Sequence, residues 1–386
     1  MTTPRRRNDR KISQIWRNDS ELELQAQAVA EIYDKLQSDM FDAMVRKLQE
    51  RGRADLEENP YLWQLEKLSG LHLLNRQNVE ELSRRSGVAI DQLERIIENE
   101  GLKIYEDTRQ QLGEERRGLY NPVNAALQAY AMQARGELEN LTNSTLPAGI
   151  RKRFQQIVEQ AVAEVVIGAK TRDKAIADTV MKWADKGFHG FTDAAGREWS
   201  AAAFARAVIK TTVYSTYNEM RTRAAREAGV NTFLYSMKAA AREACAPLQG
   251  KLVTYDAAFT AKDGTRVLSL TDYGYGTAGG CLGVHCGHYL TPFVIGVNSM
   301  PEVPDYLKDL TPEQAQENAK IQAKQRGLER SIRSHKQRLH VAEVLGDADH
   351  IQREKIAVRN RQAQIRTLID QHDFLHRDYQ REKVFN

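Results

Sequence analysis

The stretch ERSIRSHKQRLHVAEVLGDADHIQREKIAVRNRQAQIRTLIDQ, residues 329–371, decides the fold class of this chain. It holds no proline, and its apolar residues recur at helical spacing on either side of Leu345-Gly346-Asp347. Glycine suits the left-handed residue that ends a helix, and Asp347 or Asp349 can cap the helix that follows. The stretch therefore predicts two helices joined by a tight turn, a helical hairpin.

The second of these helices carries a narrow apolar seam. Ile351, Val358 and Ile365 are seven positions apart, and Leu368 and Leu375 occupy companion positions. A seven-residue apolar repeat lets a helix pack along one edge against a partner. Two partners are open at this point, namely the other helix of the hairpin and another protein.

Working outward, the chain before Gly229 is also predicted to be essentially helical. From Glu21 to Arg51 apolar residues recur about every four positions without a proline, which predicts one long helix. The Asn59-Pro60 pair predicts its end, with shorter helical segments behind it. Residues 81–101 have the rhythm of two helices joined at Ser86-Gly87, which we interpret as bundle packing because no base-reading side chains follow.

Two further segments interrupt this helical pattern. The sequence LPAGI at residues 146–150 predicts the end of one helix before another amphipathic helix begins. Residues 183–200, WADKGFHGFTDAAGREWS, combine glycines with short aromatic patches and predict a loop or a hairpin.

The residue composition and the spacing of apolar residues change at Asn231. TFLYSM, KLVTYD, RVLSL and YLTPFVIGV have the composition of short strands separated by glycine-rich turns. The predicted fold class is thus mainly α with a small α+β module. We expect four regions: a helical N-terminal region with a basic arm (1–115), a helical domain (116–230), an α+β Cys/His module (231–300) and a C-terminal helical hairpin (301–386).

Composition limits the classes of function. The chain is 28% charged, it begins without the apolar core of a secretory signal, and its longest apolar run, Val162 to Ala169, is too short to span a bilayer. We therefore expect a protein that is made and used in the cytosol, with no membrane partner.

Charge is concentrated at the start of the chain. Residues 1–20 carry six Lys or Arg against two Asp. Cations without aromatic neighbours contact phosphates and do not read bases. We therefore expect weak, non-specific contact with double-stranded DNA through Arg5, Arg6, Arg7, Arg10 and Lys11.

The sharpest local signal lies in the α+β module. Cys281, His285, Cys286 and His288 fall within eight residues, and Cys245 precedes them by thirty-six. Three cysteines are too few for a disulfide scaffold, and thiolates and imidazoles are the ligands that zinc prefers. Cys245, Cys286 and His288 are the candidate metal ligands, with Cys281 or His285 as the fourth.

Two alternatives to a structural zinc remain open. The cysteines can pack as small apolar residues around a hydrogen-bonded His288. Cys286 can instead act as a nucleophile with a histidine as base, although no orienting residue or oxyanion element is recognisable. The GxGxxG match at Gly274–Gly279 leads into a strand, which argues against a dinucleotide site.

Strand pairing is expected to bring the two parts of this cluster together. Cys245 and Cys286 each lie in a glycine-bounded turn that precedes a predicted strand. Antiparallel pairing of those strands would place both turns at one end of the sheet. Cys286 and His288 are two positions apart, so an extended chain would put both side chains on one face.

Three blocks in order resemble the phage minor capsid protein 2 family. Residues 186–212 are similar to a family stretch with a Gly-Arg-x-Trp turn (Gly196, Arg197, Trp199) and a following helix with Arg206 and Thr211. Residues 241–251 resemble an element that ends in Gln-Gly-Lys, and residues 279–296 resemble the element Gly-x-Asn-Cys-Arg-His-x-x-x-Pro-Phe. Their matching residues are Arg242, Pro247, Gln249 and Gly250, and then Gly283, Cys286, His288, Pro292 and Phe293.

The sequence departs from the family at three positions. His285 stands in place of Asn, Gly287 in place of Arg, and Cys245 in place of the usual His. The last exchange swaps one metal-capable side chain for another, which supports a shared liganding or polar role. The loss of the arginine removes a positive charge that nucleic acid would contact.

The resemblance implies a virion component of a tailed phage, attached at the portal vertex, with roles in head assembly and DNA packaging or delivery. Its partners would be the portal protein, other head proteins and viral DNA, and it would be found in the host cytoplasm during assembly. No catalytic residue and no cofactor besides the structural zinc are expected. The alternatives are a virion-carried enzyme that uses the Cys/His module and a non-specific DNA-binding protein.

Overall fold

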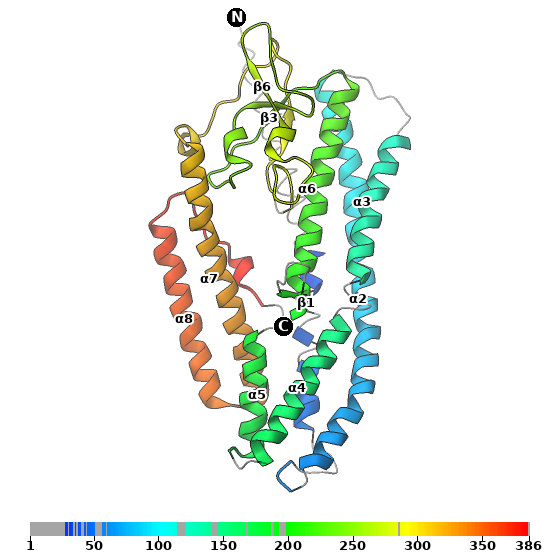
Figure 1. Ribbon diagram of the computed structural model, residues 1–386, viewed down its shortest axis with the longest axis vertical. Coiled ribbons are helices and arrows are strands. Elements are labelled where there is room, and N and C mark those ends of the chain that lie inside the picture. Colours follow the sequence, from blue (N-terminus) through cyan, green and yellow to red (C-terminus); the bar gives the residue numbers. More distant parts are fainter. Residues whose placement is uncertain are drawn as a thin grey trace, which may run out of the picture. The chain divides into compact units, whose positions relative to one another are not determined.

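The computed structural model describes residues 28–384 apart from 30, 34, 36–37, 40–41, 44, 51–55, 59, 114–120, 141–145, 167–168, 187–188, 193–197 and 285 (Figure 1). Within these residues the protein is mainly α-helical with a small mixed sheet, which confirms the predicted fold class. The chain forms two compact units. We call them the sheet unit, with Ile90–Gly136 and Arg206–Gln322, and the hairpin unit, with Ala30–Ala89, Glu137–Ala205 and Ala323–Asn386.

Long helices make up most of both units. The described positions between 28 and 49 are helical, as the four-residue repeat predicts. The helices that follow are α2 (Pro60–Gln111), α3 (Asn121–Asn140), α4 (Leu146–Val166), α5 (Arg172–Lys186), α6 (Ala201–Glu227), α7 (Pro312–Leu345) and α8 (Ala348–Asp370). Within the described residues no helix is both long and apolar enough to cross a membrane.

The expectation of short helices behind Pro60 is wrong. Pro60 begins α2, which continues without a break through Ser86-Gly87 to Gln111. A glycine inside a helix costs about 1 kcal/mol relative to alanine, a penalty that tertiary burial can outweigh. Here the buried residues around the glycine recur at helical spacing and keep one face of α2 packed: Ser86, Ile90, Leu93 and Ile97.

The prediction that LPAGI ends a helix is also wrong. The segment begins α4 at Leu146 and does not close the preceding helix, which ends at Asn140. Pro147 lies in the first turn of α4, where the missing N–H would have no helical partner in any case. The same proline that breaks a helix interior therefore begins one here.

The loop or hairpin expected in residues 183–200 is a hairpin from His189 to Ser200 in its described part, whereas residues 183–186 still belong to α5. Strand β1 (His189–Thr192) pairs antiparallel with β2 (Glu198–Ser200), with Phe191 opposite Trp199. Gly196 and Arg197 of the first family block lie outside the described residues.

The sheet unit holds a five-stranded sheet in the order β5-β6-β4-β3-β7. All four predicted strands are present, and the two-residue β5 was not predicted from the sequence. Their bounds are β3 (Phe233–Tyr235), β4 (Leu252–Thr254), β5 (Phe259–Thr260), β6 (Arg266–Ser269) and β7 (Leu290–Pro292). Strand β3 pairs antiparallel with both β4 and β7, whereas β4 and β6 are parallel.

Helix α6 is attached to this sheet by one buried side chain. The Nδ2 of Asn218 donates to the carbonyl of His288 (3.1 Å), and its Oδ1 accepts from the N–H of Leu290 (3.0 Å). Asn218 thus satisfies two backbone groups at the start of β7, which fixes that strand against the helix. Phe233, Tyr235 and Leu248 are fully buried. They belong to one hydrophobic core that also contains the three cysteines.

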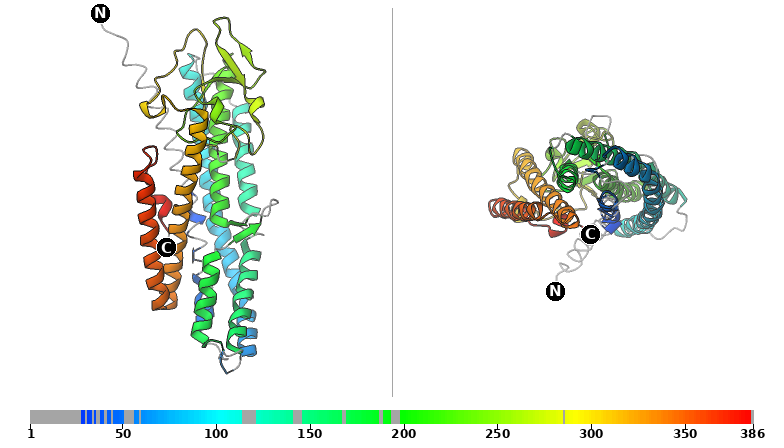
Figure 2. Two further views of the ribbon diagram at one scale, coloured as in Figure 1. Left: turned by 60° about the vertical axis from the view of Figure 1, so that its left-hand side comes forward. Right: turned by 90° about the horizontal axis from the view of Figure 1, so that it is seen from below.

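In the hairpin unit, α7 and α8 run side by side, as Figures 1 and 2 show. Their connection confirms the predicted turn, because Gly346 has a φ of 71° and the side chain of Asp347 accepts from the backbone N–H of His350 (3.0 Å). Both helices meet at the buried Glu354, whose carboxylate contacts His335 Nδ1 (2.7 Å) and Arg338 (2.6 Å).

The apolar seam of α8 is partly used within the chain. Within α8, Ile365 is fully buried, whereas Ile351, Val358 and Leu368 are half-buried. Leu375 is buried, but it lies beyond Asp370, the last residue of α8, so it is not part of a helical seam. Internal packing therefore accounts for Ile365.

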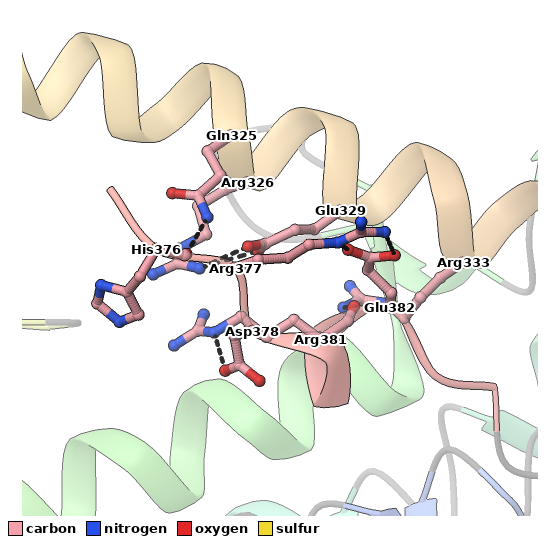
Figure 3. Close-up of polar contacts among 9 residues, drawn as sticks. All are labelled: Gln325, Arg326, Glu329, Arg333, His376, Arg377, Asp378, Arg381 and Glu382. Atoms are coloured by element: carbon pink, nitrogen blue, oxygen red, sulfur yellow. Dashed lines mark hydrogen bonds and ion pairs between the residues drawn. The ribbon is translucent and has the colours of Figure 1, made fainter. Parts of the chain in front are cut away.

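Beyond α8 the chain returns along α7 as a polar strap, residues 376–382 (Figure 3). Side chains of α7 donate to its backbone carbonyls, Gln325 to His376 (2.8 Å), Arg333 to Arg381 (2.6 Å) and Lys336 to Glu382 (2.8 Å). Within the strap, Arg377 forms a two-pronged ion pair with the buried Glu382 (2.6 and 2.8 Å). Bidentate pairs of this kind are geometrically specific, so the strap has a defined path.

Candidate functional site

The sheet topology brings Cys245 and Cys286 to one place. Both β4 and β7 are antiparallel to β3, so both begin near Tyr235, the last residue of β3. The segment with Cys245 leads into β4, and the segment with Cys286 leads into β7. The expected direct pairing of the two segments is wrong, because β3 lies between the strands they lead into. Nevertheless the two turns share one end of the sheet.

Three predicted site residues form a compact cluster. The Sγ atoms of Cys245 and Cys286 are 3.7 Å apart, and Cys286 Sγ lies 3.4 Å from Nδ1 of His288. The ligand atoms of all three residues are within 4.8 Å of one another. Cys245 is fully buried, and Cys286 and His288 are 8% and 4% exposed. This geometry suits a metal ion and also a hydrogen-bonded thiol pair.

The imidazole of His288 is held in one orientation. Its Nε2 is 3.1 Å from Oε1 of Gln249, an oxygen that also accepts from the backbone N–H of Lys238 (2.5 Å). Since this oxygen can only accept, Nε2 carries a proton, and Nδ1 is the ring nitrogen that faces Cys286. The ring of Tyr235 lies 5.1 Å from the imidazole ring and covers it.

Electrostatics differ between the two neighbouring sulfurs. The pKa of Cys286 is lowered because the thiol of Cys245 and the imidazole of His288 both hydrogen-bond to its sulfur, against the effect of burial. The pKa of Cys245 is raised because it donates to Cys286 and because it is buried. The guanidinium of Arg242 lies near both sulfurs, and its Nη1 donates to the carbonyl of Ala278 (3.4 Å). Cys286 is therefore the more acidic thiol of the pair.

Cys281, one of the two candidates for the fourth ligand, does not join this cluster. Cys281 is buried in the same core, but its Sγ donates to the carbonyl of Leu270 (3.4 Å), and burial raises the pKa of its thiol to about 11. His285 lies outside the described residues, as do Arg5, Arg6, Arg7, Arg10 and Lys11 of the basic arm. Of the two candidates for a fourth ligand, Cys281 is therefore not placed to bind.

Sequence reasoning missed the roles of three residues in the site. Arg242 and Gln249 were noticed as members of a family block, and here Arg242 lies near the sulfurs and Gln249 contacts the imidazole. Tyr235 was identified from the sequence only as part of a strand. The pKa of its phenol is raised, mainly because the side chain is buried and secondly because the sulfurs of Cys286 and Cys245 lie close to it. Arg242 and Gln249 lie in the same family block as Cys245, residues 241–251, and this shared block was the sequence signal that could have assigned them to the site.

A second group of possible ligands lies in the hairpin unit. Asp178, Asp347 and His350 have ligand atoms within 4.8 Å of one another. However, Asp178 is already paired with Lys170 (2.9 Å) and Lys174 (2.8 Å). Cations that occupy the carboxylate repel a metal ion, so we interpret this group as an ion-pair network.

The chain is similar to known phage proteins. The family described as phage minor capsid protein 2 matches residues 18–370. A structural protein of Lactococcus phage LL-H is 31% identical over 334 residues, covering 84% of this chain and 89% of that protein. A structural protein of Lactococcus phage mv4 is 39% identical over 118 residues, covering 31% of this chain and 92% of that protein. No solved structure matches the chain significantly.

Proposed function

The chain belongs to the phage minor capsid protein 2 family, and from this membership we propose that it is a minor head protein attached at the portal vertex of a tailed phage. Its structural role in the phage follows from the family and from relatives named as structural proteins. The observation that carries the proposal is the family match over residues 18–370, which includes helices of both units as well as the sheet. Head assembly and DNA packaging or delivery are the processes in which it would act.

The chemistry of the Cys/His cluster supports a role other than catalysis. A nucleophilic cysteine works as an accessible thiolate. Cys286 is 8% exposed, and its sulfur contacts Cys245 and His288 and lies near Arg242, all of them groups of the same fold. The contacts are those of a structural element, and we propose that the protein is not an enzyme.

The portal contact can be tested by co-expression. When the protein is produced with the portal protein of its own phage, we expect one complex that survives size-exclusion chromatography. Co-expression with the major capsid protein alone is the control and should give separate peaks. If the protein binds portal neither in solution nor in assembled proheads, the placement at the portal vertex is wrong.

A contact with viral DNA is the second part of the proposal. The basic arm supplies five cations, Arg5, Arg6, Arg7, Arg10 and Lys11. We expect sequence-independent binding of double-stranded DNA with a dissociation constant on the order of micromolar or weaker at low salt, abolished by roughly a few hundred millimolar salt. The measurement is fluorescence anisotropy against salt for the full chain and for a variant without residues 1–11. Equal DNA affinity of both proteins would assign the arm another use, such as docking on an acidic protein surface.

A further inference from the structure

We propose that Cys245, Cys286 and His288 bind one zinc ion, which fastens the start of β4 to the start of β7. The ion would replace a hydrogen-bonded contact between two turns that are forty-one residues apart in sequence. The sheet is small and its strands have two to four residues, so the backbone ladder alone gives the module few hydrogen bonds. A metal clasp is a common way to stabilise a module with so small a sheet.

The distances between the ligand atoms match a tetrahedral zinc site. Zinc–sulfur bonds of about 2.3 Å and zinc–nitrogen bonds of about 2.0 Å place two ligand sulfurs about 3.8 Å apart and a sulfur about 3.5 Å from a nitrogen. The corresponding separations are 3.7 Å between Cys245 and Cys286 and 3.4 Å between Cys286 and His288. The site therefore needs only small adjustments to receive the ion.

The surroundings of His288 match those of a metal ligand. A metal-bound imidazole donates its other ring N–H to an acceptor that fixes the tautomer. Gln249 supplies that acceptor at 3.1 Å, and the N–H of Lys238 holds the same oxygen in place. Nδ1, the other ring nitrogen, faces the sulfur of Cys286 at 3.4 Å and is the atom that would bind the ion. A histidine that merely filled space would not need two partners to set its orientation.

Ligand chemistry also favours the ion. Zinc would bind both sulfurs as thiolates and the imidazole through an unprotonated Nδ1, and the protons displaced from these ligands would pass to solvent. The two negative charges of the thiolates would then be balanced by the dication. Soft thiolate and imidazole ligands select zinc over magnesium or calcium.

The test uses the full chain purified from zinc-supplemented medium. We expect roughly one zinc per chain by elemental analysis, and a chelator that removes it should lower the melting temperature. Cobalt added to the metal-free protein should give the strong near-ultraviolet band of thiolate-to-cobalt charge transfer and the visible bands of tetrahedral cobalt.

The variants Cys245→Ser, Cys286→Ser and His288→Ala should each lose the ion. Cys281→Ser is the matched control, because its sulfur is equally buried but bonds to Leu270 and should keep zinc at the wild-type level. If the ligand variants fail to fold, the cobalt spectrum of the wild-type protein decides. Folded wild-type protein that holds no zinc and gives no charge-transfer band would overturn the proposal. Zinc loss in a folded Cys281→Ser variant would overturn the assigned ligands.

Discussion

Gly280→Ala is expected to lower the free energy of unfolding by about 3 kcal/mol or more, because the added methyl group has no space. A Cβ at this buried glycine would lie 1.8 Å from the carbonyl oxygen of Gly274 and 2.8 Å from Oγ1 of Thr277. The first of these neighbours is backbone, so it cannot rotate away as the end of a side chain would. The loop must open, although Cys281 holds it by a hydrogen bond to Tyr273 (3.0 Å).

Gly279→Ala is the matched control. This glycine is the preceding residue, it is exposed, and a Cβ there would meet no atom within 4 Å. Its effect on stability should stay within about 0.5 kcal/mol, as is usual for surface substitutions. Urea unfolding followed by circular dichroism measures both variants. Similar midpoints for the two would show that the loop adapts and that its close packing is not required.

The same pair of variants also reports on the proposed zinc site. The loop that contains Gly280 leads to Cys286, so its displacement should move one ligand sulfur. We expect Gly280→Ala to bind cobalt more weakly than Gly279→Ala does, even under conditions where both are folded.

Glu354→Ala is expected to destabilise the protein by about 3 kcal/mol, because it removes a buried carboxylate that bonds both Arg338 and His335. The side chain of Glu354 is 4% exposed and contacts Arg338 and His335 across the α7–α8 hairpin. Its removal leaves the positive charge of Arg338, whose side chain is 19% exposed, in a poorly hydrated position. Urea unfolding again gives the measurement.

Two further variants make this result interpretable. Glu343→Ala removes an exposed carboxylate from α7, the other helix of the hairpin, and should change stability by less than about 0.5 kcal/mol. In Glu354→Ala with Arg338→Ala, the total loss should be smaller than the sum of the single losses, because both single variants remove the same contact between the two side chains. If Glu354→Ala behaves like Glu343→Ala, apolar packing alone holds the hairpin.

The sequence by itself determined most of the secondary structure. Helical periodicity and the Gly346-Asp347 turn are local signals, since each acts through a residue and its neighbours within about one helical turn. The strands of the α+β module were identified by another local signal, their composition between glycine-rich turns. Where local reasoning failed, at Ser86-Gly87 and at Pro147, the residues are compatible with two local structures, and burial or position in the first turn decided between them.

Only the tertiary structure decided how the candidate site is assembled. Cys245 and Cys286 meet because β3 lies between the strands that follow them, a pairing that no local pattern encodes. Gln249 orients His288 across a gap of 39 residues, and Arg242 lies near the sulfur of Cys286 although the two are far apart in sequence. Residue types and spacing could therefore identify the candidate metal ligands. Whether Cys281 joins Cys245, Cys286 and His288 depended on the direction of its side chain, which the sequence does not give. Sheet order and side-chain direction are set by long-range packing, because many pairings of short strands bury similar apolar area.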